Sequence, residues 1–383
     1  MKVGVYLGNN SSYDGGGFTF QETIADALLQ SKFPHEFHIF HSNKKSLVKT
    51  AYHQLITASQ KIFFSFFNVN LNIYKGELEK KIHKEKVDLV WFVTPEFDNV
   101  TVPFMITVWD LQHRFQPFFP EVSIGFDGKE WERRENYYRS ILPRATYILT
   151  GTEIGKKELI KFYGIPEERI KILPFPTPTF FLKKNVNKKI KLKYNLPKNY
   201  LFYPANFWPH KNHISLLLAL KILIETYKLD FSLVFTGSDK GNLEFIMNEA
   251  RKLGIVEKVY FLGFVSKEEL KELYKNAFAL VFPSLFGPDN LPPLEAMACG
   301  CPVIAGEIPG AKEQFGNDTV LLVNPINEEE IAKMVKVLFR DKNLRNKLIE
   351  KGYTKVNRWT AESYIKEICK ILDEFEFYRR CWR

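Results

Sequence analysis

The chain has 383 residues, of which 45% are hydrophobic and 26% are charged. This length suggests two domains, and the composition excludes a globally disordered, collagen-like or low-complexity protein. The formal net charge of +10 favours an anionic partner, which could be a phosphate-bearing small molecule, a nucleic acid or an anionic lipid surface. The 15% aromatic content suits buried cores, stacking on bases or sugars, or a bilayer interface.

The cysteines and the apolar runs bear on the cellular compartment. All four cysteines lie in the last quarter of the chain without zinc-like spacing, which suggests a reduced cytosolic protein. Residues 1–8 contain an apolar run that is too short for a signal peptide, and no run approaches the ~18 apolar residues of a membrane-spanning helix. We therefore expect a cytoplasmic protein that at most contacts the inner face of a membrane.

In the first half of the chain, short apolar runs alternate with helical patterns. A buried strand is expected over residues 3–7, and a Gly-rich loop over residues 9–17 leads into a helix over residues 18–29. Further strands are expected over residues 36–40, 87–92, 104–108 and 146–150, and a further helix over residues 154–163. Such alternation indicates an α/β domain, in which helices cover both faces of a parallel sheet.

A proline-rich segment at residues 173–179 marks a domain boundary, because it cannot continue a helix or form a central strand. After it, strands are expected over residues 200–203, 231–236, 259–262, 279–282 and 302–305, with helical patterns between them and over residues 328–339, 344–353 and 361–377. We therefore expect an N-terminal Rossmann-like domain (1–176), a linker (177–199), a C-terminal Rossmann-like domain (200–357), and a C-terminal helix and tail (358–383) that returns to the first domain. A cleft should separate the two domains.

Residues 282–304 carry the strongest indication of a site. A strand ends there in a loop of Gly, Pro and Asn, prolines follow at the start of a helix, and Gly300 ends that helix. Backbone amides at a helix start can hold phosphate, and Glu295 lies one turn inside the helix. A carboxylate there suits two neighbouring sugar hydroxyls. The alternative is an ordinary strand-to-helix connection with a surface glutamate.

Residues 203–213 form a second candidate loop, which leaves the first strand of the second half. The carboxyl edge of an open α/β sheet is where such sheets bind ligands. Lys211 in this loop is a natural counter-charge for a diphosphate, although an isolated loop lysine is more often simply solvated. Two more strands of this half end in small-residue loops at residues 235–238 and 261–266.

In their order and spacing, the four segments at residues 203–213, 235–238, 261–266 and 282–304 resemble those of the retaining nucleotide-sugar glycosyltransferases of family 4. The GT-B fold of that family consists of two facing Rossmann-like domains. The run Leu-Pro-Pro-Leu-Glu-Ala-Met-Ala-Cys-Gly-Cys-Pro-Val-Ile at residues 291–304 is highly specific for that family, and the Pro-His-Lys-Asn loop at residues 209–212 is moderately specific. In the first half the similarity is weaker, and it rests on the glycine triplet at residues 15–17 and on residues 145–153.

The resemblance implies roles for individual residues. Glu295 matches the carboxylate that binds the donor ribose, Lys211 matches the lysine that binds the diphosphate, and the loop with Phe264 and Val265 reads the base. Amides near Leu291 would then stabilise the charge that develops on the departing diphosphate. The expected donor-binding residues are Gly16, Gly17, Asn206, Lys211, Gly237, Phe264, Val265, Asp289, Asn290, Leu291 and Glu295.

The chain departs from the family's pattern at the sugar-phosphate centre. Gly287 replaces a second glutamate, which leaves Asp289 as a substitute carboxylate for the donor sugar. Asn206 replaces an arginine that shares the phosphate in many relatives. One cation and one carboxylate of the family's site are therefore missing.

A third departure lies in the first half. Trp109 replaces the histidine of the family's His-Asp loop, so Asp110 and His113 are the candidates for binding sugar hydroxyls there. Together with Lys211 they form the predicted catalytic set. The alternative interpretation is that Asp110 caps a helix and that His113 is a surface histidine.

The resemblance implies a hexosyltransferase, of mannosyl or rhamnosyl type, that retains the anomeric configuration and acts in polysaccharide, lipopolysaccharide or glycolipid assembly. The expected partners are a GDP-, UDP- or dTDP-linked sugar and a glycan or lipid-linked acceptor, and no nucleic acid. Peripheral membrane contact through residues 61–67 or 378–383 is a secondary interpretation. No cofactor and no metal is expected, since the sequence lacks an Asp-x-Asp pair. A non-catalytic nucleotide-sugar or glycan-binding protein is the alternative function.

Overall fold

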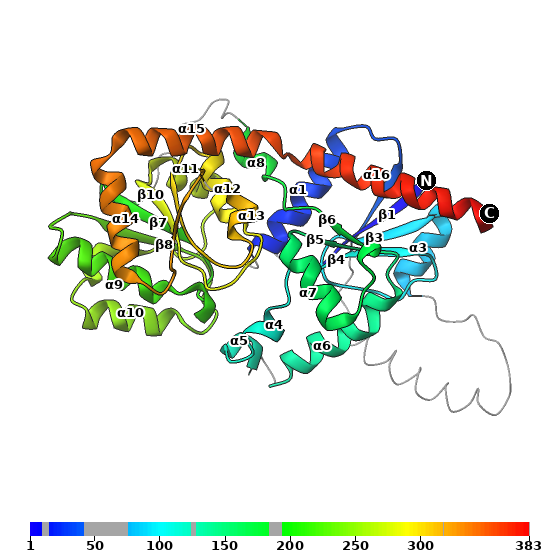
Figure 1. The fold of residues 1–383 in the computed structure, drawn as a ribbon, viewed down its shortest axis with the longest axis horizontal. Coiled ribbons are helices and arrows are strands. Elements are labelled where there is room, and N and C mark those ends of the chain that lie inside the picture. The colour runs from blue at the N-terminus through cyan, green and yellow to red at the C-terminus, as the bar shows by residue number, and fades with distance from the viewer. Residues whose placement is uncertain (10–14, 42–75, 124–127, 184–193, 317, 383) are drawn as a thin grey trace.

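The structure, a computed structural model, describes residues 1–9, 15–41, 76–123, 128–183, 194–316 and 318–382. These residues form two α/β domains side by side, each built around a six-stranded sheet (Figure 1). All neighbouring strands in both sheets are parallel. The expected α/β architecture of two Rossmann-like domains is therefore confirmed.

The first domain has the strand order β2-β1-β3-β4-β5-β6. Its strands are β1 (Lys2–Leu7), β2 (Glu36–His41), β3 (Leu89–Phe92), β4 (Phe104–Thr107), β5 (Tyr147–Thr150) and β6 (Ile170–Ile172). The helices that connect them are α1 (Gly16–Gln30), α3 (Glu77–Glu85), α4 (Gln112–Phe115), α5 (Pro120–Ser123), α6 (Glu130–Ile141) and α7 (Glu153–Tyr163). The short helix α8 (Thr179–Leu182) follows in the connection to the second domain.

The second domain has the strand order β12-β11-β10-β7-β8-β9. Its strands are β7 (Tyr200–Pro204), β8 (Ser232–Thr236), β9 (Val259–Phe261), β10 (Ala279–Phe282), β11 (Val303–Gly306) and β12 (Leu321–Val323). Its helices are α9 (His213–Glu225), α10 (Leu243–Lys252), α11 (Lys267–Asn276), α12 (Leu291–Ala298), α13 (Ala311–Phe315), α14 (Glu328–Arg340) and α15 (Lys342–Arg358). The strand order reverses between β7 and β10, and open α/β sheets bind ligands at such a point.

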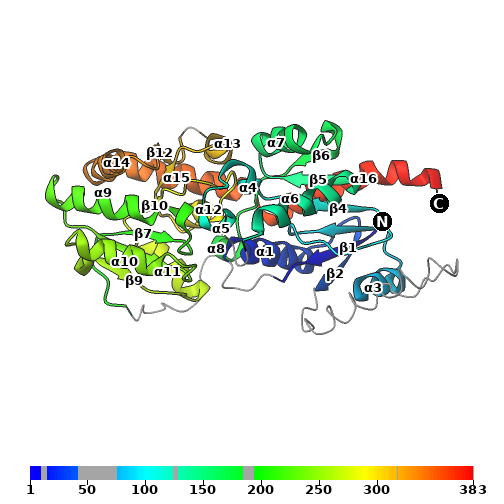
Figure 2. The same cartoon turned by 90° about the horizontal axis from the view of Figure 1, so that it is seen from below.

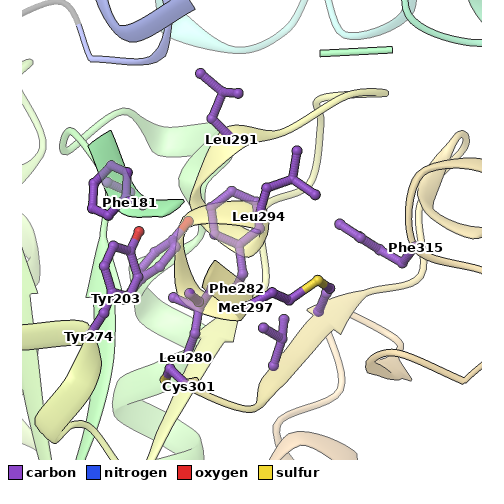
Figure 3. Close-up of a cluster of buried hydrophobic side chains, with 14 of the residues drawn as sticks. Phe181, Tyr203, Tyr274, Leu280, Phe282, Leu291, Leu294, Met297, Cys301 and Phe315 are labelled. Carbon is purple, nitrogen blue, oxygen red and sulfur yellow. The ribbon is translucent and has the colours of Figure 1, made fainter. Parts of the chain in front are cut away.

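The central strands are uninterrupted apolar runs because helices cover both faces of each sheet. Every residue of β3 (Leu-Val-Trp-Phe) and of β10 (Ala-Leu-Val-Phe) is buried. In the second domain, Tyr203 packs on Phe282 and Tyr274 packs on Phe202, in the buried cluster that also contains Leu294 of α12 and that Figure 3 shows in close-up. Much of the aromatic content therefore fills the cores, and the core of the second domain supports the helix that carries Glu295.

Eight of the described α-helices and strands fall outside the stretches that the sequence pattern predicted, and four of these, α4, α5, α8 and α13, are helices of only four or five residues. Strands β6 and β12 have three residues each and lie at the sheet edges, where a short run gives little signal. Helices α3 and α6 are strongly charged, and each buries only two apolar side chains, Leu78 and Ile82 in α3 and Tyr138 and Ile141 in α6, so the apolar stripe that marks a surface helix is narrow.

The C-terminal helix α16 (Ala361–Arg379) returns to the first domain, as expected (Figure 1). Tyr364 of α16 is fully buried and stacks on Trp91 of β3 at 6.2 Å between ring centroids. The chain crosses between domains at Trp359, whose indole N–H donates to the carbonyl of Pro174 at 2.8 Å. The two connections between the domains thus touch each other at this crossing.

Within the described residues, no helix combines the length and the apolar character that a membrane crossing needs. The four cysteines are free, and Cys381 is the exposed member. Residues 61–67, one candidate for membrane contact, lie outside the described residues. The second candidate segment ends α16, where Tyr378 and Trp382 are exposed.

Candidate functional site

A cavity of about 440 Å³ lies between the two domains. The N-terminal ends of α1 and α4 in the first domain and of α12 in the second line the cavity, and Figure 2 shows the three helices on the sides of the domains that face each other. All the predicted site residues except His113 line it, namely Gly16, Gly17, Asp110, Asn206, Lys211, Gly237, Phe264, Val265, Asp289, Asn290, Leu291 and Glu295. The fold therefore brings residues from six separate segments of the chain to one place.

Lys211 enters the cavity from a 3-10 turn (Pro209–Lys211) that follows β7. The Tyr203 hydroxyl donates to the Lys211 carbonyl at 2.7 Å and so anchors the turn. The Lys211 Nζ lies 3.4 Å from Ser284 Oγ, and no carboxylate oxygen of the described residues lies within ion-pair distance of it. Burial lowers the pKa of Lys211 to about 8, although Asp110 and Glu121 oppose this effect. A cation held in a cavity wall without a carboxylate partner is stabilised by a bound anion.

Glu295 lies one turn inside α12 and is 6% exposed. Its Oε2 accepts a hydrogen bond from the Tyr274 hydroxyl at 2.8 Å. Burial raises the pKa of Glu295 to about 7, against the opposing effects of Tyr274 and of Lys267. Its Oε1 has no hydrogen-bond partner among the described residues, so the carboxylate retains an acceptor for a ligand hydroxyl.

The start of α12 offers fewer amides than the sequence suggested. Pro292 and Pro293 have no N–H, and the Asn290 N–H donates to Gln314 Oε1 at 3.0 Å. The Leu291 N–H is therefore the one first-turn amide left for a ligand. The expectation of several phosphate-binding amides at this helix is corrected to one.

A second helix start, that of α1, faces the cavity from the first domain. Its N-cap residue Gly15 makes no side-chain capping bond, and its first turn has no acidic residue. Gly15 has φ +76°, a backbone conformation that other residues rarely adopt, and a Cβ atom on it would only be in van der Waals contact with Asn206 of the other domain. Asn206 itself is held in place, because its Oδ1 accepts from the Ser238 N–H at 2.8 Å.

The loop at Gly287 has a backbone conformation that disfavours the glutamate implied there by the resemblance. Gly287 has φ +123°, and a Cβ atom on it would lie 2.5 Å from Asn290 Oδ1. Asp289, the expected substitute, lines the cavity, but Phe175 N–H donates to one carboxylate oxygen and Gln314 Nε2 donates to the other, the latter at 2.7 Å. Asp289 therefore connects the loop between β10 and α12, which we call the donor loop, to the interdomain connection at Phe175. Burial raises the pKa of Asp289 to about 7.

Asp110 and His113 follow β4 but have different surroundings. Asp110 lines the cavity, and its Oδ1 accepts from the Gln112 N–H at 2.9 Å and from Arg134 at 2.7 Å. Although burial opposes ionisation, Arg134 holds the pKa of Asp110 below its usual value. The neighbouring Trp109 also lines the cavity, and its indole N–H is buried without a partner in the described residues.

His113 does not reach the cavity, which corrects its predicted role. It is fully buried on the other side of α4, where Nε2 lies 3.3 Å from Glu135 and 3.2 Å from the Tyr163 hydroxyl. Burial lowers the pKa of His113 to about 4. The residue is neither a sugar ligand nor a surface histidine.

The loop with Phe264 and Val265, which the resemblance assigns to the base, lines the cavity with one exposed and one buried residue. Phe264 is 47% exposed, whereas Val265 is buried. Ser266 then begins α11 with a capping box, in which the Ser266 hydroxyl accepts from the Glu269 N–H and the Glu269 carboxylate accepts from the Ser266 N–H. The loop is thus fixed at its end and presents the partly exposed ring of Phe264 to the cavity.

Three lining or supporting residues were missed in the sequence. His210 lines the cavity and pairs with Glu121 of α5, and Gln314 of α13 holds the donor loop. His210 could have been found, since it precedes Lys211 in the candidate loop. Glu121 and Gln314 could not, because they are brought there only by the fold.

Among the described residues, one other group has the geometry of a metal site. The potential ligand atoms of His35, Asp373 and Glu376 lie within 4.8 Å of one another. His35 Nε2 is already 3.0 Å from Asp373, and its Nδ1 is 3.1 Å from the amino group of Met1. This group is not part of the cavity lining.

Comparison with known proteins finds a family model, curated relatives and solved structures that resemble this chain. The model of the glycosyl transferases group 1 family matches residues 185–355. The O-antigen chain mannosyltransferase RfbU of Salmonella typhimurium is 29% identical over 241 residues, which are 62% of each chain. The O-antigen chain mannosyltransferase B of Escherichia coli is 26% identical over 226 residues, which are 58% of this chain and 59% of the relative. The match thus spans less than two thirds of the length of these curated relatives.

Solved structures resemble the chain over its whole length. Sucrose-phosphate synthase of Thermosynechococcus elongatus has a TM-score of 0.72 at 16% identity, and the match covers 98% of this chain and 99% of that one. HepE of Anabaena in complex with UDP has a TM-score of 0.68 at 15% identity, and the match covers 98% and 100%. At such identity the likeness concerns the fold. The chain has the GT-B fold, and its residues 185–355 match the model of the group 1 glycosyl transferases.

Proposed function

We propose that the protein is a retaining glycosyltransferase that moves a mannosyl-type sugar from a nucleotide diphosphate sugar to an acceptor hydroxyl in polysaccharide or lipopolysaccharide assembly. The observation that carries the proposal is Lys211, a cation without a carboxylate partner in the wall of the interdomain cavity. Glu295 lies in the same wall with one carboxylate oxygen unused. A nucleoside diphosphate matches both groups, with its ribose hydroxyls at Glu295 and its phosphates at Lys211.

The proposed chemistry depends on stabilising the leaving group. As the bond between the anomeric carbon and the phosphate oxygen breaks, its electron pair passes to the diphosphate. Lys211, the Leu291 N–H and the uncapped start of α1 would stabilise that charge in a partly dehydrated cavity. In the retaining mechanism that we propose, the acceptor oxygen attacks from the same face, and its proton passes to the departing phosphate.

We further propose that transfer needs no metal ion. The carboxylates that line the described cavity are Asp110, Asp289 and Glu295, and each already accepts hydrogen bonds from protein groups. Lys211 and helix-terminal amides supply positive charge in place of a cation. Sugar transfer by metal-free protein in the presence of a chelator would test this part.

The relatives inform the choice of donor and acceptor. Two of them carry the name O-antigen chain mannosyltransferase, which supports a mannosyl donor and a glycan or lipid-linked acceptor. HepE is described in complex with UDP, which keeps a UDP-linked donor beside GDP- and dTDP-linked ones. Exposed Tyr378 and Trp382 support an accessory contact with a membrane surface on the cytoplasmic side.

The test is to replace Lys211 with alanine and measure transfer from a panel of GDP-, UDP- and dTDP-sugars. We expect turnover to fall by about 100-fold or more, because a preorganised charged group of this kind contributes ~3 kcal/mol to the transition state. Lys252→Ala on the exposed face of α10 is the matched control. Unchanged turnover in Lys211→Ala would contradict the proposal. Donor binding without transfer or hydrolysis in the unaltered protein would favour the non-catalytic alternative.

A further inference from the structure

His210 precedes Lys211 in the same turn and pairs with a residue of the other domain. Its Nδ1 is hydrogen-bonded to the Glu121 carboxylate of α5, which also accepts from the His210 main-chain N–H at 3.4 Å. The two side chains are only 11% and 8% exposed. The pair is therefore enclosed where the domains meet, directly beside the cation of the proposed phosphate site.

The ionisation of Glu121 fixes which ring nitrogen of His210 carries the proton. Although burial opposes the charge, the hydrogen bonds from His210 hold the pKa of Glu121 below its usual value. An ionised carboxylate can only accept, so Nδ1 is the donor and Nε2 has the free lone pair. Nε2 has no hydrogen-bond partner among the described residues, and the ring lines the cavity.

Charged groups from several elements face this imidazole. Burial and the adjacent Lys211 lower the pKa of His210, whereas Glu121 of α5 and Asp110 of the β4–α4 loop oppose them. His213 at the start of α9 stays neutral, because burial lowers its pKa to about 3. The ring is therefore neutral in the empty protein, and an anion in the cavity would raise its pKa.

The charge in the cavity wall does not match that of the ligand. Of the lysines in the described lining, Lys267 forms an ion pair with Glu22 of α1, which leaves Lys211 as the unpaired one. The diphosphate of a nucleotide sugar carries two negative charges. A second positive charge is therefore needed, and His210 is the titratable group beside Lys211 that can supply it.

We propose that His210 is the second cation for the donor diphosphate and that it takes up one proton from solution when the diphosphate binds. This inference rests on the proposed function, since it requires a diphosphate at Lys211. The protonated Nε2–H then donates to a phosphate oxygen while Nδ1–H remains on Glu121. As the glycosidic bond breaks, the same N–H stabilises the electron pair left on the phosphate.

The experiment counts protons. GDP and UDP are titrated calorimetrically into the full chain at pH 6.5 in two buffers of different ionisation enthalpy, and the slope gives the number of protons taken up. The variants are His210→Gln, which cannot titrate, and Glu121→Gln, which removes the carboxylate but keeps the imidazole. His83→Gln, on α3 and outside the cavity lining, is the control.

We expect the unaltered protein and His83→Gln to take up more protons on nucleotide binding than His210→Gln does, by about half a proton or more per molecule. Proton uptake by Glu121→Gln should lie between these two values. We also expect nucleotide affinity in His210→Gln to be about 10-fold weaker at pH 6 and closer to normal at pH 8, where the histidine of the unaltered protein is less protonated. Titration of the nucleotide phosphate, Glu295 and Asp289 occurs in every variant and cancels in these differences.

Equal proton uptake with and without His210 would overturn the inference. So would a His210→Gln variant with lower sugar transfer but unchanged proton uptake, since that result would place the ring on the acceptor hydroxyl. If the unaltered protein bound neither nucleotide nor any of the nucleotide sugars, the proposed function itself would be refuted. Coincident thermal unfolding curves establish that each variant is folded.

Discussion

Replacing Glu295 with glutamine should stabilise the folded protein while it weakens nucleotide binding. The buried carboxylate has its pKa raised from 4.5 to about 7. At ~1.4 kcal/mol per pKa unit, the ionised group costs the folded state about 3 kcal/mol above pH 7. Glutamine removes this charge and can still accept the hydrogen bond from Tyr274. The same substitution removes the charged acceptor that we place at the donor ribose.

The sign of the pH dependence follows from proton linkage. Because the pKa of this acid is higher in the folded than in the unfolded state, the folded protein binds the proton more tightly between pH 4.5 and 7. The contribution of Glu295 to stability is therefore lost as the pH rises through that window. Glu295→Gln should raise the unfolding midpoint at pH 8 by several degrees and have little effect at pH 5.

The assay is thermal unfolding at both pH values, combined with calorimetric titration of nucleoside diphosphate at pH 8. Affinity should fall by about 10-fold, the usual effect of losing a hydrogen bond to a charged group. Glu244→Gln, an exposed change on α10, is the control. A stability difference that is the same at pH 5 and pH 8 would refute the electrostatic reasoning. Unchanged affinity would remove Glu295 from the ribose site.

Two further changes test the loop that holds the donor. Gly287→Glu should lower the unfolding free energy by about 1–3 kcal/mol and should not raise transfer, because of the positive φ and the contact with Asn290; a more active, equally stable variant would contradict the observed loop geometry. Gln314→Ala should cost about 1–3 kcal/mol, since it leaves the Asn290 N–H and one carboxylate oxygen of Asp289 without the partner that Gln314 provides. Its nucleoside diphosphate affinity should fall more than its affinity for the nucleoside, and an equal loss for both ligands would speak against a role at the phosphate.

The domain architecture could be predicted because the central strands are long apolar runs and the connecting helices alternate with them. The edge strands β6 and β12, at three residues each, gave too little pattern. The polar helix α6 has only a narrow apolar stripe, since much of its surface is charged. The elements that the sequence pattern did not predict therefore lie at the periphery of each sheet, where little apolar surface is buried.

The residues of the candidate site also divide into those that the sequence predicted and those that it did not. Lys211 and Glu295 were predicted because the turn and the helix that carry them are encoded in short contiguous motifs. The prediction that His113 lies in the site was wrong, because a one-turn helix gives no sequence signal for the face on which a side chain lies. Glu121 and Gln314 act on the site from 89 and 24 residues away along the chain, so only the folded chain reveals them.

The return of α16 to the first domain has a consequence for the order in which the chain folds. Trp91 is synthesised early, yet its stacking partner Tyr364 follows 273 residues later, after the whole second sheet. During translation the second domain can therefore be complete while the first still exposes the apolar surface that α16 covers. The N-terminal half expressed alone would carry the same exposed surface and should aggregate, although its sheet is continuous in sequence.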